Sequence, residues 1–217
     1  MRNLTKSDEP EILKQNADIW LDQYLEDKNS STKKYRYRHK KIKEALKKET
    51  GHKCVYCESK IGHNTPGDIE HKIPSSKAVH LHFDWNNMTM ACAECNRRKN
   101  DYYEDGEAFL DPYIDDVESL LEHHGPIILW RIGQKRAEIT VRILELNSFR
   151  RSSLICRKME KIEEVCNLAE RLSSEKNRLL KLLLLRQLEQ MKDKSSEYSA
   201  MVISILKTRG GGCEGTA

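Results

Sequence analysis

Two pairs of cysteines have the spacing in this chain that most directly indicates chemistry. Cys54 and Cys57 form one C-x-x-C pair, Cys92 and Cys95 form another, and 34 residues lie between the pairs. Four thiolates in this arrangement suit Zn²⁺ in a closed tetrahedral site, which is structural because it has no open position. We therefore predict a zinc ion that stabilises a segment with little apolar core of its own.

A carboxylate followed directly by a histidine lies between the cysteine pairs, at Glu70-His71. Hydrolysis of a phosphodiester requires a base to activate water, a hard cation to stabilise developing charge, and cationic contacts to the backbone. His71 has the intrinsic pKa of a base that works near neutral pH. Glu70 and the amide oxygen of Asn96 are hard ligands that suit Mg²⁺. This combination predicts a nuclease site rather than a zinc module alone.

Basic residues occur in two places where they could contact a nucleic-acid backbone. Arg97, Arg98 and Lys99 follow Asn96 directly. Between Lys33 and Lys48 there are seven lysines and two arginines against one acid. Contacts to phosphates release counterions and give affinity that does not depend on base sequence. In each place the alternative is a solvated helix face. The predicted contacts in the second stretch are Lys33, Lys34, Arg36, Arg38, Lys40 and Lys41.

The elements that must position these residues divide the chain into four segments. Residues 1–50 follow a helical pattern that breaks at 29–31, and the second helix is the basic one. Residues 51–111 contain the cysteines in short segments with glycine and proline. Residues 112–208 are helical except for a short strand predicted at Ile127–Trp130. Residues 209–217 form a glycine-rich tail, in which Cys213 has no expected role.

Two stretches outside the central module can each be interpreted in two ways. Nine acids and no Lys or Arg occur between Asp101 and Gly125, either as a solvated surface or as a docking site for a basic partner. Closely spaced leucines between Glu175 and Lys207 indicate packing within a helical scaffold, with a partner-binding helix as the alternative.

Composition excludes several classes of protein. The chain has 217 residues, a formal net charge of +4 and 33% charged residues, and its mean hydropathy is -0.74. No apolar run approaches the roughly 20 residues of a membrane span, and the polar N-terminus does not resemble a secretory signal. Seven cysteines without an export signal indicate reduced thiols. We therefore expect a cytoplasmic protein with one core and appendages.

The central stretch resembles the HNH (ββα-metal) endonuclease family in its four-cysteine form. The resemblance implies that His71 is the general base, that Asn87 fixes the loop and the orientation of His71, and that Asn96 binds a catalytic Mg²⁺ or Mn²⁺ beside Glu70. Asn96 stands where the family name has a histidine, and Asn86 and Asn100 are alternatives. The implied fold is mainly α with a small central ββα-metal (HNH) module braced by a four-cysteine zinc site. The matching stretches are Cys54–Glu58, Ile69–Pro74, Trp85–Met88 and Ala91–Lys99.

The resemblance continues over residues 1–157 towards the HNH proteins of Septu and retron defence systems, the PtuB group. It rests on Met1–Lys6, Phe109–Pro112, Thr140 and Leu146-Asn147. It implies a bacterial anti-phage effector that acts with a PtuA-like ATPase. In retron versions the further partners are a reverse transcriptase and its multicopy DNA.

Three alternatives remain open at the sequence level. The favoured substrate is DNA, and tRNA or another RNA is the alternative. A zinc module that binds nucleic acid or a partner protein without catalysis is the rival from another class, although it leaves the joint occurrence of Glu70, His71, Asn87 and Asn96 unexplained. A lesser alternative makes His80 and His82 ligands of the active metal.

Overall fold

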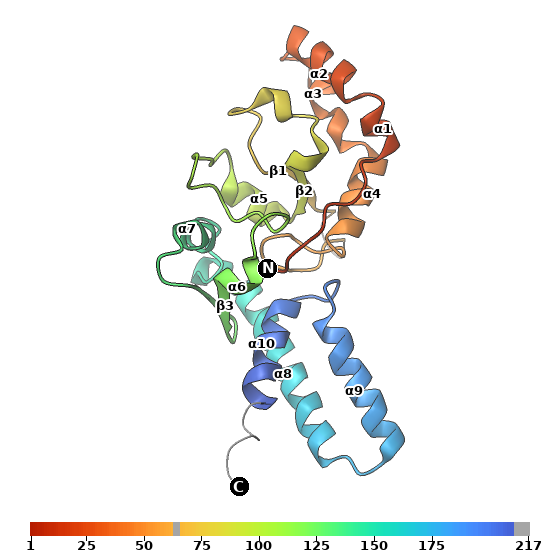
Figure 1. The fold of residues 1–217 in the computed structure, drawn as a ribbon, viewed down its shortest axis with the longest axis vertical. Coiled ribbons are helices and arrows are strands. Elements are labelled where there is room, and N and C mark those ends of the chain that lie inside the picture. Colours follow the sequence, from red (N-terminus) through yellow and green to blue (C-terminus); the bar gives the residue numbers. More distant parts are fainter. Residues whose placement is uncertain (63–65, 211–217) are drawn as a thin grey trace.

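The computed structural model describes residues 1–62 and 66–210. The molecule is elongated, with the N-terminal helices at one end, the C-terminal helices at the other, and two short strands followed by a helix between them (Figure 1). One hydrophobic core extends from the N-terminal helices through the central strands to α7 (Lys135–Ile143). This mainly helical fold with a small ββα unit is the class predicted from the sequence.

The N-terminal fifty residues fold into short helices, and the prediction of one continuous basic helix is wrong. The basic stretch is interrupted at a 3-10 turn because Tyr37 turns inwards to pack against the rings of His71 and His82. His39 then begins the next helix, where its ring Nδ1 accepts a hydrogen bond from the backbone N–H of Lys41. The elements are α1 (Glu11–Lys14), α2 (Ala17–Glu26), α3 (Ser31–Lys34), η1 (Tyr35–Arg38) and α4 (Lys40–Glu49).

The central segment is a two-stranded antiparallel sheet followed by one helix. Strand β1 (Asp68–His71) pairs with β2 (Met88–Ala91), so that Glu70 lies opposite Thr89 and His71 opposite Met88. Gly67 precedes β1 at a φ of +67°, and a Cβ there would lie 2.5 Å from Ile61, so the position requires glycine. The remaining elements are η2 (Val79–Leu81), η3 (Trp85–Asn87) and α5 (Ala93–Lys99).

The C-terminal segment is a β-hairpin followed by a helical bundle. The strand predicted at Ile127–Trp130 is confirmed as β4, and its partner β3 (Leu121–His124) was not predicted. The longest helices, α8 (Ser152–Ser174) and α9 (Arg178–Lys192), form an antiparallel pair against which α10 (Ser199–Gly210) packs (Figure 1). The shorter elements are α6 (Val117–Leu120) and η4 (Phe149–Arg151).

The acidic stretch between 101 and 125 pairs in part with cations of its own chain. Asp111 lies 2.6 Å from Lys72, and Asp115 lies 2.8 Å from Arg136. A third acid, Glu118, lies 2.9 Å from the side chain of Arg2 near the N-terminus. These ion pairs join the central strands, α7 and the N-terminal segment, so part of this acidic stretch serves the fold.

The tail predicted from residue 209 overlaps the last helix, because α10 continues to Gly210. Residues 211–217, with Cys213, lie outside the described residues. In the part of the chain that the structure describes, no helix combines the length and apolar character that crossing a bilayer requires.

Candidate functional site

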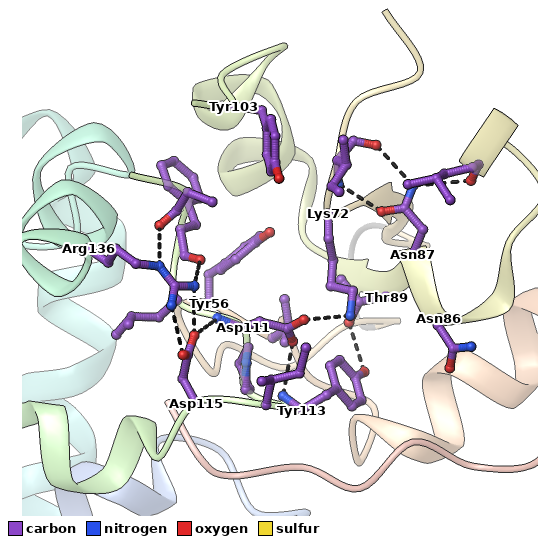
Figure 2. A pocket seen from close by; sticks show the side chains of 18 of the residues that line it. Tyr56, Lys72, Asn86, Asn87, Thr89, Tyr103, Asp111, Tyr113, Asp115 and Arg136 are labelled. Carbon is purple, nitrogen blue, oxygen red and sulfur yellow. Dashed lines mark hydrogen bonds and ion pairs between the residues drawn. The ribbon is translucent and has the colours of Figure 1, made fainter. Parts of the chain in front are cut away.

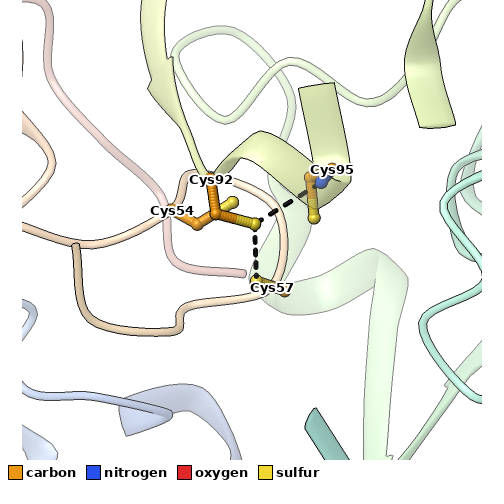
Figure 3. A group of neighbouring side chains, drawn as sticks. All are labelled: Cys54, Cys57, Cys92 and Cys95. Atoms are coloured by element: carbon orange, nitrogen blue, oxygen red, sulfur yellow. Dashed lines mark hydrogen bonds between the residues drawn. The ribbon is translucent and has the colours of Figure 1, made fainter. Parts of the chain in front are cut away.

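The four cysteines converge on one point from two separate loops. Their Sγ atoms all lie within 4.8 Å of one another, and this is the only such group of metal-binding side chains among residues 1–62 and 66–210 (Figure 3). The Sγ atoms of Cys57 and Cys92 are 3.8 Å apart. A tetrahedron with Zn–S bonds of about 2.3 Å requires S–S separations of about 3.8 Å. The donor set therefore fits a structural zinc ion, as predicted.

The expectation that this segment has little apolar core is wrong, because the thiols lie in the main hydrophobic core beside the buried side chains of Val55 and Met90. Cys54 and Cys57 lie on a tight turn after α4, and Glu58 closes the turn at a φ of +60°. Cys92 begins α5, and its Sγ accepts a hydrogen bond from the backbone N–H of Cys95. The strand pair thus delivers one half of the cluster and the turn delivers the other.

One ring nitrogen of His71 is hydrogen-bonded to the protein, and the other has no hydrogen-bond partner among the described residues. Nε2 donates a hydrogen bond of 2.8 Å to the backbone carbonyl of His82. Nδ1 has no hydrogen-bond partner among the described residues and is not sealed from the surface. Burial lowers the pKa of the His71 imidazole to about 4, against the opposing effect of the hydrogen bond to His82. The ring is therefore neutral at pH 7, with the Nδ1 lone pair available to accept a proton.

The rings of His82 and Tyr37 hold His71 in place. His82 stacks on His71 with ring centroids 5.0 Å apart and an interplanar angle of 7°, and the ring of Tyr37 meets His71 edge-on at 4.7 Å. His82 is itself fixed, because its Nε2 donates to the carbonyl of Lys34 and its Nδ1 accepts from the hydroxyl of Ser75. The alternative in which His80 and His82 bind the active metal is therefore wrong, since both nitrogens of His82 are occupied.

Asn87 cross-links the loop that follows β1. Its side-chain oxygen accepts from the backbone N–H of Ile73, and its amide donates to the carbonyls of Ile73 and Leu81 (Figure 2). Leu81 directly precedes His82, so these bonds also fix the carbonyl that holds His71. Asn86 is exposed, and its side chain makes no hydrogen bond among the described residues. The geometry therefore favours Asn87 over Asn86 as the residue that positions the loop.

Glu70 is buried and lies beside Lys99, a residue that we predicted to contact nucleic acid. Its Oε1 is 2.6 Å from Nζ of Lys99, and both side chains are almost fully buried. Oε1 accepts no well-directed hydrogen bond, so this buried oxygen keeps lone pairs for a second cation. Burial raises the pKa of Glu70 to about 7, Lys99 opposes the rise, and Asp68 adds to it. The oxygen chemistry fits a hard divalent ion that competes with Lys99.

The expectation that Lys99 contacts phosphate needs correction. The side chain is 2% exposed, and Nζ also donates to the backbone carbonyl of His71. Lys99 therefore ties α5 to the Glu70-His71 pair from within the module, and it is not on the surface that a nucleic-acid strand would touch.

Asn96 faces β1 as expected, but its hydrogen-bond partner differs from the predicted neighbour. The side-chain amide of Asn96 donates to Asp68 at 3.3 Å. Asp68 and Glu70 are two residues apart on β1, so their side chains lie on the same face of the strand. Asp68 was not predicted as a site residue, although the alternation of a strand would have indicated it. Three oxygen-bearing side chains thus lie between β1 and α5.

The basic residues predicted to contact nucleic acid differ in their solvent exposure and in their pairing with other side chains. Arg97 is exposed but pairs with Glu94, and Arg98 is largely buried between Glu94 and Glu145. In the N-terminal stretch, Lys33 and Lys34 are half-buried and Arg36 bonds to Gln23. Arg38 is exposed and stacks on the ring of Tyr35 at 4.2 Å. Lys40 and Lys41 are also exposed, and Lys40 lies 3.8 Å from Glu44.

Residues 54–102 match the family model described as HNH endonuclease. The chain is also similar to two curated proteins, each named Septu protein PtuB. The protein of Bacillus thuringiensis is 25% identical over 176 residues, which cover 76% of this chain and 68% of that protein. The protein of Bacillus mycoides (strain KBAB4) is 29% identical over 143 residues, which cover 51% of this chain and 48% of that protein.

These similarities agree with the geometry. The chain carries an HNH endonuclease domain, and the matched segment includes the four cysteines, β1, β2 and α5. This domain supports a nuclease that hydrolyses phosphodiester bonds. The four-cysteine HNH module and the similarity to PtuB that were predicted from the sequence are both confirmed.

Proposed function

We propose that this chain is a metal-dependent endonuclease that acts as the effector of a bacterial anti-phage defence system. One observation carries the catalytic part of the proposal. His71 is held by a hydrogen bond from Nε2 to the carbonyl of His82, which leaves the Nδ1 lone pair without a hydrogen-bond partner among the described residues. His82, which only packs, has both ring nitrogens hydrogen-bonded, whereas His71 keeps one nitrogen unpaired among the described residues, beside a buried carboxylate.

The residues of the site divide the work of hydrolysis between them. His71 accepts the proton of the attacking water at Nδ1, and the Nε2–H bond to His82 stabilises the imidazolium that forms. Glu70 and Asn96 would hold Mg²⁺ or Mn²⁺, with Asp68 beside them. The divalent ion supplies charge stabilisation at the scissile phosphate and leaving oxygen when it is bound. Asn87 keeps the His82 carbonyl and the loop after β1 in place.

The N-terminal segment supports a nucleic-acid substrate next to His71. Tyr37 packs on His71, and it lies on the same short turn as the exposed Arg38. Lys41 follows on the first turn of α4 and is exposed as well. The Arg38 guanidinium lies 5.8 Å from the ring of Tyr37, so it is near the catalytic ring, where it would attract phosphates without reading bases. We take DNA as the substrate, and tRNA is the alternative that the same chemistry accepts.

We infer that an ATPase resembling PtuA delivers or restrains the nuclease in the bacterial cytoplasm. The support is the similarity to proteins named Septu protein PtuB, together with a helix that offers a surface for a partner. Five leucines of α9 are 40–66% exposed, which is more apolar surface than one helix of a scaffold needs. In a retron setting the partners would include a reverse transcriptase and its multicopy DNA. The exposed leucines are Leu179, Leu180, Leu182, Leu183 and Leu185.

The purified full-length protein, with and without its ATPase partner, tests the proposal on plasmid DNA and on total tRNA. Mg²⁺, Mn²⁺ and EDTA are compared in parallel. His71→Ala should lower the cleavage rate by roughly 10²- to 10⁴-fold, because it removes the general base. Its zinc content and helicity should not change. His80→Ala is the matched control, since the His80 side chain is exposed and makes no hydrogen bond among the described residues.

Two outcomes distinguish the rival functions. Full activity in His71→Ala would defeat the catalytic proposal and favour a zinc module that binds nucleic acid or a partner. Cleavage of tRNA but not plasmid, lost in His71→Ala, would keep the mechanism and replace the substrate.

A further inference from the structure

Two buried cations in the C-terminal segment lie near the cysteine cluster. Arg151 is 7% exposed and Lys158 is 1% exposed. Neither has a carboxylate within ion-pair distance among residues 1–62 and 66–210. A buried cation without a compensating charge is costly, because its hydration is lost and nothing replaces it. The fold must therefore supply negative charge near these two side chains in another form.

Arg151 contacts the cluster directly. One guanidinium nitrogen, Nη2, lies 3.4 Å from Sγ of Cys95, and Nη1 donates to the carbonyl of Leu144 at 2.9 Å. Burial acts to lower the pKa of Arg151, but the sulfurs of Cys95 and Cys57 outweigh it and raise the pKa above its ordinary value. The guanidinium is thus held by sulfur where a carboxylate would usually be found.

Lys158 is the second buried cation. Arg151 is the N-cap of α8, and Lys158 lies seven residues further along that helix. Nζ of Lys158 donates to the carbonyl of Pro126 at 3.0 Å. Burial lowers the pKa of Lys158 to about 8, and the nearby Cys57 and Glu58 oppose this. Glu58 is already paired with Lys53 at 2.9 Å and with the N-terminal ammonium of Met1 at 3.5 Å, so the cysteine cluster is the remaining source of negative charge for Lys158.

A zinc-loaded cluster would supply the negative charge that these two cations lack. One Zn²⁺ and four thiolates carry a net charge of −2, and two buried cations carry +2. We propose that Arg151 and Lys158 are the counter-charges of the Cys54–Cys57–Cys92–Cys95 zinc centre, and that zinc binding therefore holds α8 against the nuclease module. Arg151 is a positioning residue that donates to a ligand sulfur, as groups around metal ligands commonly do.

Zinc binding and the contact between α8 and the module are thermodynamically linked, so a change in either one should affect the other. When zinc leaves and the thiols take up protons, the two cations lose their counter-charge, and the contact between α8 and the module weakens. Conversely, removal of either positive charge weakens zinc binding even though neither residue touches the metal. The inference rests on the thiol cluster and not on the nuclease activity, so the two succeed or fail separately.

The test measures zinc affinity of the full-length protein by competition with a chromophoric zinc chelator. Arg151→Gln and Lys158→Gln should each weaken zinc binding by roughly 10- to 100-fold, the usual effect of losing a group that supports a metal ligand. Arg151→Lys keeps the charge and should recover most of the affinity. The matched controls are Arg150→Gln and Arg157→Gln, because these neighbours are exposed.

A second measurement does not depend on any variant. Amide hydrogen exchange of the native protein is followed while the chelator removes zinc. Protection over residues 149–165 should fall at the chelator concentration at which zinc is lost. Zinc affinities of Arg151→Gln and Lys158→Gln that equal those of the controls would overturn the proposal. So would unchanged protection of residues 149–165 in the zinc-free protein.

Discussion

The four cysteines and the Glu70-His71 pair lie in the same small module, but their potential ligand atoms are arranged differently. The sulfurs face one another, whereas the carboxylate faces a lysine. The sulfurs converge within 4.8 Å of one another, and those of Cys57 and Cys92 have the 3.8 Å separation of a zinc tetrahedron. The oxygen of Glu70 instead faces Lys99 at 2.6 Å, and Asn96 bonds to Asp68. The four sulfurs therefore suit a structural zinc ion, whereas at the proposed hard-ion site Glu70 is paired with Lys99, with which a divalent ion would have to compete.

This difference fits what each metal does. A structural ion replaces hydrophobic core and has to be present while the chain folds. A catalytic ion exchanges, and a site that the protein can close by itself is stable in the absence of that ion. The two sites can therefore be separated by substitutions that affect stability in one case and ion binding or rate in the other.

The largest effect is expected for Cys92→Ser. Structural zinc contributes roughly 10–16 kcal/mol of binding free energy in small zinc domains, which is comparable to the whole stability of a typical domain. Loss of one thiolate should remove most of this contribution and abolish cooperative unfolding of the module. Circular dichroism melting and zinc stoichiometry check it.

Cys156→Ser is the control for the same chemical change, because Cys156 is exposed and lies outside the cluster. A Cys92→Ser protein that retains one zinc ion per chain and the unfolding temperature of the control would show that the cluster is not part of the fold.

Asn87→Ala should leave the zinc centre intact and affect the histidine. The substitution removes hydrogen bonds to Ile73 and Leu81, and the second of these holds the stretch whose carbonyl fixes His71. Misplacement of a catalytic group by about 1 Å can cost on the order of 10²-fold in rate, and we expect a loss of that size. Cleavage rates at saturating Mg²⁺ measure it, with Asn86→Ala as the control. Equal rates in the two variants would contradict the role given to Asn87.

The sequence was sufficient for the features that depend on local spacing. Two C-x-x-C pairs predict a zinc centre because each pair forms a turn that brings its own two sulfurs together. The order of the ββα elements follows from the resemblance carried by Ile69–Pro74 and Ala91–Lys99. Burial of Asn87 and its bonds to the loop are consistent with the position that the resemblance gave it.

The features that the sequence did not reveal depend on packing between distant segments. The basic stretch has the propensity of one helix, yet the gain from burying Tyr37 against His71 breaks it. Three consecutive cations after Asn96 look equivalent, but the turn of α5 directs Lys99 inward towards Glu70. Arg151 carries no local signal at all, because its partner Cys95 is 56 residues away. Only the tertiary fold brings these groups together.

Lys99→Met tests whether the hard-ion site is closed by competition. Two cations that share one carboxylate repel each other, so removal of the ammonium should tighten the binding of Mn²⁺. A charge about 4 Å away contributes up to about 4 kcal/mol at an effective dielectric of 20, and we expect a gain of at least tenfold in affinity. Mn²⁺ titration followed by electron paramagnetic resonance measures the binding in zinc-loaded protein.

Arg97→Met is the control, since it removes an exposed cation from the same helix. If Lys99→Met binds Mn²⁺ no more tightly than this control, Lys99 does not compete for the site, and its role is confined to holding Glu70 and the carbonyl of His71.

The smallest effect concerns the dependence of folding stability on pH. It separates the contribution of His82 from that of the zinc centre. Burial lowers the pKa of His82 below its ordinary 6.5. Below that pH the unfolded chain binds a proton that the folded chain does not, so stability falls as pH falls, by at most about 1.4 kcal/mol per pH unit. His82→Phe removes this proton and should flatten the dependence between about pH 6.5 and the lower pKa of the folded state. Urea unfolding at a series of pH values measures the slope, with His80→Phe as the control.

The pH at which zinc is released should be the same in the unsubstituted protein and in both variants, because zinc release follows protonation of the thiolates. A slope that does not change in His82→Phe would place the acid sensitivity of the fold in other groups, such as the buried His71 and the zinc centre.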